Sequence, residues 1–170
     1  MSDVKTLRLV SAQLTQPTLD AFLVYERTVI GALASTWEPP ETSWAGRFAF
    51  AHAKGLAESG LDPLTQQRIK VPVSEFCGKR SAWLTVKQRV ADAEAALHQA
   101  RAHQQPEPEK ERALLARASG ELARLGDFSG FIRRYGQQAF ELLTERELEL
   151  VTLHRQLSRL EGPGGHLHRS

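Results

Sequence analysis

Apolar residues recur along most of the chain at steps of three and four, the spacing that lines one face of an α-helix. The alternation of apolar and polar residues that is typical of a half-buried strand is scarce. The pattern predicts an all-α protein, a bundle of about four main helices with short connections. Helical segments are expected over about 17–34, 44–58, 62–103, 108–125 and 137–160.

Residues that begin or end helices stand at most of these boundaries. Thr15 is suited to cap a helix with a proline in its first turn, and Asp62 is suited to cap the third helix. Gly60 is placed to end the second helix, because glycine readily adopts the left-handed conformation found after many helices. The pair Pro39-Pro40 predicts a break between the first and second helices.

The third predicted helix contains the stretch IKVPVSEFCGKRSAW, residues 69–83. Pro72 has no N–H for a helical hydrogen bond, so it predicts a kink or an interruption in this helix. A phosphate-binding loop is excluded, because Val73 stands where the first glycine of such a loop is required. No histidine is near Cys77 in the sequence and no nucleophile signature surrounds it, so we expect a buried, structural thiol.

The composition is that of an ordinary globular protein. The chain has 170 residues, of which 41% are hydrophobic and 25% are charged. This length suits one domain with a proper core. We expect a single helical-bundle domain over 1–161 and a flexible, glycine-rich tail over 162–170. The sequence contains no internal repeat of useful length, and no motif in it identifies a known family.

The net charge is only +2, which argues against a dedicated nucleic-acid binder, because phosphate contacts need a concentrated positive field. Arginine outnumbers lysine and alanine is abundant, as in bacterial proteins with GC-rich coding.

A single cysteine cannot form an internal disulfide. The N-terminus lacks the pattern of a signal peptide, and no apolar stretch approaches the ~20 residues of a membrane-spanning helix. We therefore expect a cytoplasmic protein with no membrane span.

Several ionisable residues fall inside the apolar faces of the predicted helices. Burying such a group is costly unless it is paired or hydrogen-bonded, so this placement calls for an explanation. The residues that share it are Glu26, His52, Glu94, Arg146, Glu147 and His154.

Three explanations are open for these residues. One is a set of buried ion pairs between helices, for example of Arg146 with Glu26 or Glu94, that fixes the helix register. Another is a metal or small-ligand site, since bundles hold divalent metals with inward carboxylates and histidines from facing helices. The third is that these residues lie at the edges of wide apolar faces, with their charged ends in water. The candidates for the metal or ligand site are Glu26, His52, Glu94, Glu147 and His154.

A second group of candidates is basic. Lys79, Arg80 and Lys87 fall within about a third of the circumference of the third helix, as an anion contact would require. A solvated helix face is the alternative. Arg133 and Arg134 lie in the segment DFSGFIRRYG. They either hold an anion or lie outside a short corner that places aromatic side chains in the core.

The last predicted helix is unusually rich in leucine, more than one bundle face requires. This favours a non-catalytic soluble protein that acts through protein–protein contact, with self-association as one form of that contact. A central, well-covered helix would show the same excess. The alternative function is a metal- or small-ligand-binding bundle, including an enzyme. The leucines in question are Leu143, Leu150, Leu153, Leu157 and Leu160.

Overall fold

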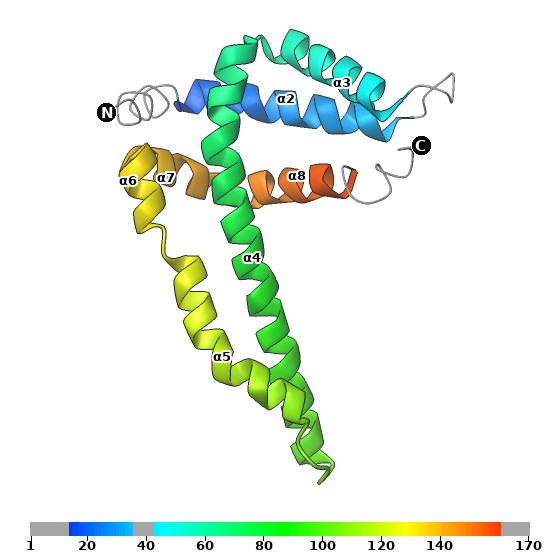
Figure 1. Cartoon of the computed structure of the whole chain (residues 1–170), viewed down its shortest axis with the longest axis vertical. Coiled ribbons are helices and arrows are strands. Elements are labelled where there is room, and N and C mark those ends of the chain that lie inside the picture. Colours follow the sequence, from blue (N-terminus) through cyan, green and yellow to red (C-terminus); the bar gives the residue numbers. More distant parts are fainter. Residues whose placement is uncertain (1–13, 36–42, 161–170) are drawn as a thin grey trace. The chain divides into compact units, whose positions relative to one another are not determined.

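The computed structural model describes residues 14–35 and 43–160 of the chain (Figure 1). These residues contain helices and no strand, which confirms the predicted all-α class. None of the helices in the described ranges is long and apolar enough to cross a membrane. The helices are α2 (Gln16–Ala34), α3 (Trp44–Ser59), α4 (Pro63–Ala102), α5 (Glu109–Gly126), α6 (Ser129–Tyr135), α7 (Gln137–Glu145) and α8 (Glu147–Leu160).

The helix boundaries in the structure follow the capping residues of the sequence. Thr15 accepts a hydrogen bond from the backbone N–H of Thr18 and caps α2. The Asp62 carboxylate accepts the N–H groups of Leu64 and Thr65, both at 3.0 Å, at the start of α4. Gly60 ends α3 with φ of +69°. The predicted break at Pro39-Pro40 and the predicted tail over 162–170 lie outside the described residues.

The long third helix with an internal proline is confirmed as α4, whose 40 residues run through Pro72 without an interruption. The Pro72 side chain is fully buried. Proline removes the hydrogen bond that its N–H would give to the carbonyl of Arg68, and tight packing of the ring offsets part of this loss.

The last predicted helix is divided in the structure. A single residue, Arg146, has φ of −108° and ψ of 16° and separates α7 from α8. The Thr144 hydroxyl donates to the Phe140 carbonyl at 2.8 Å just before the break. No glycine or proline marks this position, so the sequence pattern predicted one continuous helix.

Contacts group the chain into two units. Unit 1 contains the residues up to Cys77 and those from Phe131 onward, and unit 2 is Gly78–Gly130. The single domain over 1–161 therefore stays a prediction, and each unit is described by itself.

In unit 1, α2 and α3 form a closely packed helical pair (Figure 1). Gly55 makes the close approach possible, because a Cβ atom there would lie 2.8 Å from Tyr25 Cδ2 and 2.9 Å from Val29 Cγ2. Ala51, one turn earlier on α3, is also buried. Small residues on one face of α3 thus allow the side chains of α2 to pack against its backbone.

A cluster of aromatic rings forms another part of the unit 1 core. The Phe76 ring centroid lies 6.1 Å from those of Phe131 and Phe140, with the rings edge to face. Phe131 and Tyr135 of α6 are buried, whereas Arg133 and Arg134 beside them are exposed. From Phe131 to Tyr135 the chain therefore places aromatic side chains in the core and arginines at the surface, the second of the two arrangements expected for DFSGFIRRYG.

The leucine-rich face of α7 and α8 is also turned into unit 1. Leu143, Leu150 and Leu153 are buried, and α8 packs against α2. Coverage within the unit thus accounts for these three leucines, whereas Leu157 and Leu160 are half-buried. Leu148 lies outside this face and is 85% exposed.

Unit 2 is a helical hairpin made by α4 from Gly78 onward and by α5. Its buried residues on α4 follow at steps of seven, four and three, which keeps them on one face of the helix, and three of the five in the seam are alanines. Alanine lets two helices approach closely but buries little apolar surface. The seam residues are Val86, Ala93, Leu97, Ala100 and Ala118.

Candidate functional site

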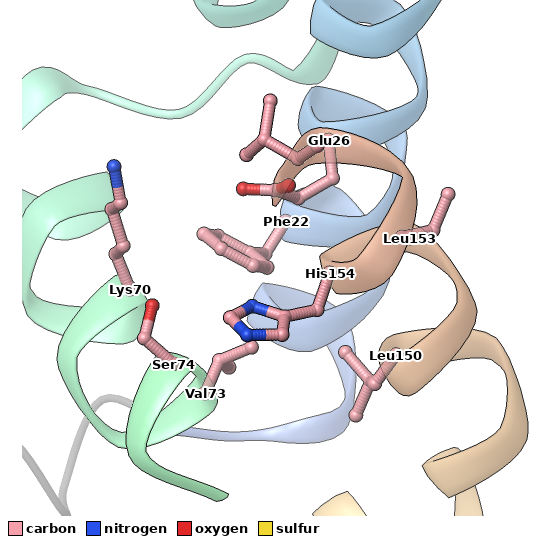
Figure 2. A pocket seen from close by; sticks show the side chains of 9 residues that line it. Phe22, Glu26, Lys70, Val73, Ser74, Leu150, Leu153 and His154 are labelled. Atoms are coloured by element: carbon pink, nitrogen blue, oxygen red, sulfur yellow. The ribbon is translucent and has the colours of Figure 1, made fainter. Parts of the chain in front are cut away.

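The predicted site residues of unit 1 meet in part at a small cavity of about 30 Å³ between α2, α4 and α8 (Figure 2). Aliphatic and aromatic side chains form most of its wall, and four polar side chains interrupt that wall. The lining residues are Phe22, Glu26, Lys70, Val73, Ser74, Leu150, Leu153, His154 and Leu157.

The four polar residues come from three helices. Glu26 is only 8% exposed and lies one turn from Phe22 on α2. Lys70 and Ser74 are one turn apart on α4, so they face the same side of that helix. The imidazole of His154 on α8 reaches into the same space (Figure 2).

The structure therefore brings together two of the predicted residues, Glu26 and His154. Lys70 and Ser74 were missed by the sequence analysis, because neither stands out in the apolar pattern of α4. A cavity of about 30 Å³ has room for one or two water molecules and is far below the size of an ordinary ligand pocket. This geometry suits a buried polar cluster better than a substrate site.

His52 has a different role from the one expected. Its Nδ1 atom lies 2.7 Å from the Tyr25 hydroxyl, within hydrogen-bonding distance, and its ring is stacked on Phe48. Tyr25 and Glu26 are neighbours on α2, where successive residues point about 100° apart. Tyr25 therefore faces α3 while Glu26 lines the cavity, and His52 is not among the cavity residues.

The other two metal or ligand candidates, Glu94 and Glu147, do not line the cavity. Glu94 is exposed on the α4 portion of unit 2, so the expectation of an inward carboxylate there is wrong. One helix, α5, covers this part of α4, and the apolar face is narrower than the sequence pattern suggested. Glu147 is half-buried at the start of α8. Across residues 14–35 and 43–160, no three His, Cys, Asp or Glu side chains are grouped so that they could hold a metal ion.

Arg146 makes ion pairs, but not with the partners suggested by the sequence. Its guanidinium donates to Asp20 at 2.5 Å and, through Nε and Nη2, to one Glu149 oxygen at 3.0 and 2.7 Å. Arg27 also pairs with Glu149. The side chains of Arg146 and Glu149 are half-buried, at 29% and 27% exposed, whereas those of Asp20 and Arg27 are exposed. The hydrogen bond from Arg146 is the main cause of the lowered pKa of Asp20.

Cys77 is fully buried, as expected for a structural thiol. Burial, with smaller contributions from the negative charges of Glu26 and Glu147, raises its pKa to about 12. A thiol with this pKa is protonated at neutral pH and is a poor nucleophile.

In unit 2 the predicted basic residues form what we call the basic cluster: Lys79, Arg80 and Lys87. Arg80 Cζ and Lys87 Nζ lie 5.4 and 5.0 Å from the ring centroid of Trp83. Lys79 Nζ and Arg80 Cζ lie 4.8 and 5.6 Å from the ring centroid of Phe128. These are cation–π distances. The sequence suggested the three cations but not the two rings between them.

The two arginines of α6 in unit 1 are arranged differently. Arg134 pairs with the carboxylate of Glu75, which also accepts a hydrogen bond from the Tyr135 hydroxyl at 3.0 Å. Burial, followed by the hydrogen bond to Glu75, raises the pKa of Tyr135. Arg133 is exposed. Arg134 thus forms an ion pair with Glu75 of the same chain.

A groove of about 460 Å³ runs between α4 and α5 in unit 2. We call it the hairpin groove. It was not predicted, because it depends on which faces of the two helices are brought together. Its floor is apolar and its rim is charged. The lining residues are Arg89, Asp92, Ala93, Ala96, Lys110, Glu111 and Leu114.

Comparison of the chain with known protein families, with curated proteins and with solved structures found no match.

Proposed function

We propose that this chain is a non-catalytic helical protein that acts through protein–protein contact, and that a second copy of the chain occupies its hairpin groove. The observation that supports the proposal is the composition of the groove. An apolar floor of two alanines and a leucine lies between two pairs of opposite charges on α4 and α5.

The floor suits a helix as its occupant. Ala93 is buried, Ala96 and Leu114 are half-buried, and all three line the groove. Helices pack at interaxial distances of 8–10 Å, and small side chains at the contact favour the shorter ones. Covering a half-buried leucine and two alanines also removes apolar surface from water, which favours association.

The rim favours a second copy over an unrelated partner. It carries two bases, Arg89 and Lys110, and two acids, Asp92 and Glu111. In a two-fold symmetric contact the same patch is used on both chains, so the patch must complement itself. A rim with equal numbers of positive and negative groups meets this condition, whereas an unrelated partner would not require such a balance.

Sedimentation equilibrium on the whole chain, over about 1 to 200 μM, tests the proposal through the concentration dependence of the mass. We expect a monomer–dimer equilibrium. Ala96→Glu places a charge in the floor and should weaken the dimer at least about tenfold, since an unpaired charge in an interface is costly. Ala95→Glu is the matched control, because Ala95 is the exposed neighbour of Ala96 and does not line the groove. A strict monomer, or equal effects of the two substitutions, would contradict the proposal.

A further inference from the structure

The basic cluster of unit 2 has a defined spacing along α4. Lys79, Arg80 and Lys87 lie within about 100° of the helix circumference at ~100° per residue. The eight-residue step from Lys79 to Lys87 corresponds to about 12 Å along the axis at 1.5 Å per residue. A ligand that met all three cations would therefore carry at least two negative groups about 12 Å apart.

The cations of the cluster are held by aromatic rings. Trp83 lies under Arg80 and Lys87, and Phe128 lies under Lys79 and Arg80. A ring face attracts a cation without neutralising its charge. Long basic side chains usually lose much conformational freedom on binding, and side chains already resting on rings lose less.

Basic residues outnumber acidic ones beside the cluster, where the contacts place Asp127. From Gly78 to Ala91, α4 carries the basic residues Lys79, Arg80, Lys87 and Arg89 and no acidic residue. Lys79 donates to the backbone carbonyl of Asp127, and the Asp127 carboxylate accepts the N–H of Ser129 at 2.9 Å.

We propose that the basic cluster binds an acidic peptide segment of a partner protein, with glutamate or aspartate side chains on its cations. Glutamates eight residues apart on a helix would reproduce the spacing of about 12 Å. Nucleic acid is disfavoured, because the Trp83 ring, which would otherwise stack on a base, already carries two cations. The whole chain also has a net charge of only +2. The cluster shares no residue with the hairpin groove, so this binding is independent of the pairing of two copies.

Fluorescence anisotropy of the whole chain with a fluorescein-labelled peptide of alternating glutamate and alanine residues tests the proposal. The ionic strength is kept at about 20 mM, where exposed charges are weakly screened. The variant Arg80→Gln/Lys87→Gln should bind the peptide about tenfold more weakly than the unaltered chain. The control, Arg117→Gln/Arg159→Gln, makes the same change of charge at exposed positions outside the cluster and should bind within about twofold of the unaltered chain.

Two further binding measurements complete the test. Lys87→Arg retains the charge over Trp83 and should retain binding. A labelled single-stranded oligonucleotide of equal charge should bind more weakly than the peptide. The proposal is overturned if the peptide fails to bind or if the cluster and control variants bind it equally. Tighter binding of the oligonucleotide would overturn it as well. A chain that binds the peptide as a strict monomer would support this inference while contradicting self-association.

Discussion

The Tyr25 hydroxyl lies 2.7 Å from Nδ1 of His52 and links α2 to α3. Tyr25 is 3% exposed, so its hydroxyl has little access to water. A buried polar group needs a partner, and the imidazole provides one across the helical pair. The pair is therefore part of what fixes α3 against α2.

Tyr25→Phe removes this interaction with little change of shape. We expect the free energy of unfolding to fall by about 1 kcal/mol, the usual net value of one hydrogen bond. Urea denaturation measures the change. The same substitution made in a His52→Ala background should cost less, and the difference between the two costs is the coupling of the pair. A coupling of zero would mean that the interaction does not stabilise the fold.

The packing of α3 on α2 predicts a large effect at Gly55. In Gly55→Ala the added methyl would lie under 3 Å from both Tyr25 and Val29, so these helices must move apart. We expect a loss of about 1–3 kcal/mol of stability, the usual range for overpacking.

The matched control for this substitution is Gly31→Ala on α2, where the added methyl meets open space. It should stabilise the chain by about 0.5–1 kcal/mol, because alanine favours the helix over glycine. If thermal unfolding shows a raised melting temperature for both variants, the close packing of α2 on α3 at Gly55 is contradicted.

The raised pKa of Cys77 predicts a loss of stability at alkaline pH. In the unfolded chain the thiol ionises near its ordinary pKa of 9.0, whereas in the folded chain its pKa is about 12. Below pH 9.0 both states hold the proton and the thiol adds no pH dependence. Between pH 9.0 and about 12 only the unfolded state releases it, so the free energy of unfolding falls as the pH rises.

Urea denaturation of the unaltered chain and of Cys77→Ala, from about pH 7 to pH 10.5, tests this expectation. The variant loses the thiol and should show a shallower decline above pH 9.0. Its lower stability at neutral pH, from the smaller side chain, does not affect this comparison of slopes. Identical slopes would contradict a buried, protonated thiol.

The ion pair of Asp20 with Arg146 predicts that loss of the arginine changes the pKa of one carboxyl group, that of Asp20. The hydrogen bond from Arg146 holds the pKa of Asp20 below its ordinary value of 3.8, because it favours the ionised carboxylate. In Arg146→Met the pKa of Asp20 should rise toward 3.8, as followed by carboxyl chemical shifts in NMR. Arg159→Met, at an exposed position on α8, should leave it unchanged.

Much of the helix pattern could be read from the sequence because its boundaries have local causes. Thr15 and Asp62 cap helices with their own side chains, and Gly60 adopts a left-handed conformation. The break at Arg146 has no such local marker, and a continuous helix was the natural prediction.

The site was less predictable, because it depends on which helix faces meet. The apolar pattern correctly indicated that Glu26 is inward, and the structure places it with His154. The same reasoning was wrong for Glu94, since a single partner helix leaves it exposed. The Phe128 ring beside the basic cluster and the hairpin groove both require a second segment to be placed against α4, which no periodicity specifies. Trp83, by contrast, lies one turn from both Arg80 and Lys87 on α4 itself, so helical spacing alone could have indicated it.

The central proposal, that two copies pair through the hairpin groove, is tested most directly by making its rim uniform in charge. Arg89→Glu/Lys110→Glu gives an acidic-rim variant, and Asp92→Lys/Glu111→Lys gives a basic-rim variant. Each should sediment as a monomer by itself, because like charges then face each other across the two-fold axis. An equimolar mixture should sediment at the dimer mass. Dimers of either variant alone, or a mixture that stays monomeric while the unaltered chain dimerises, would contradict pairing through this groove.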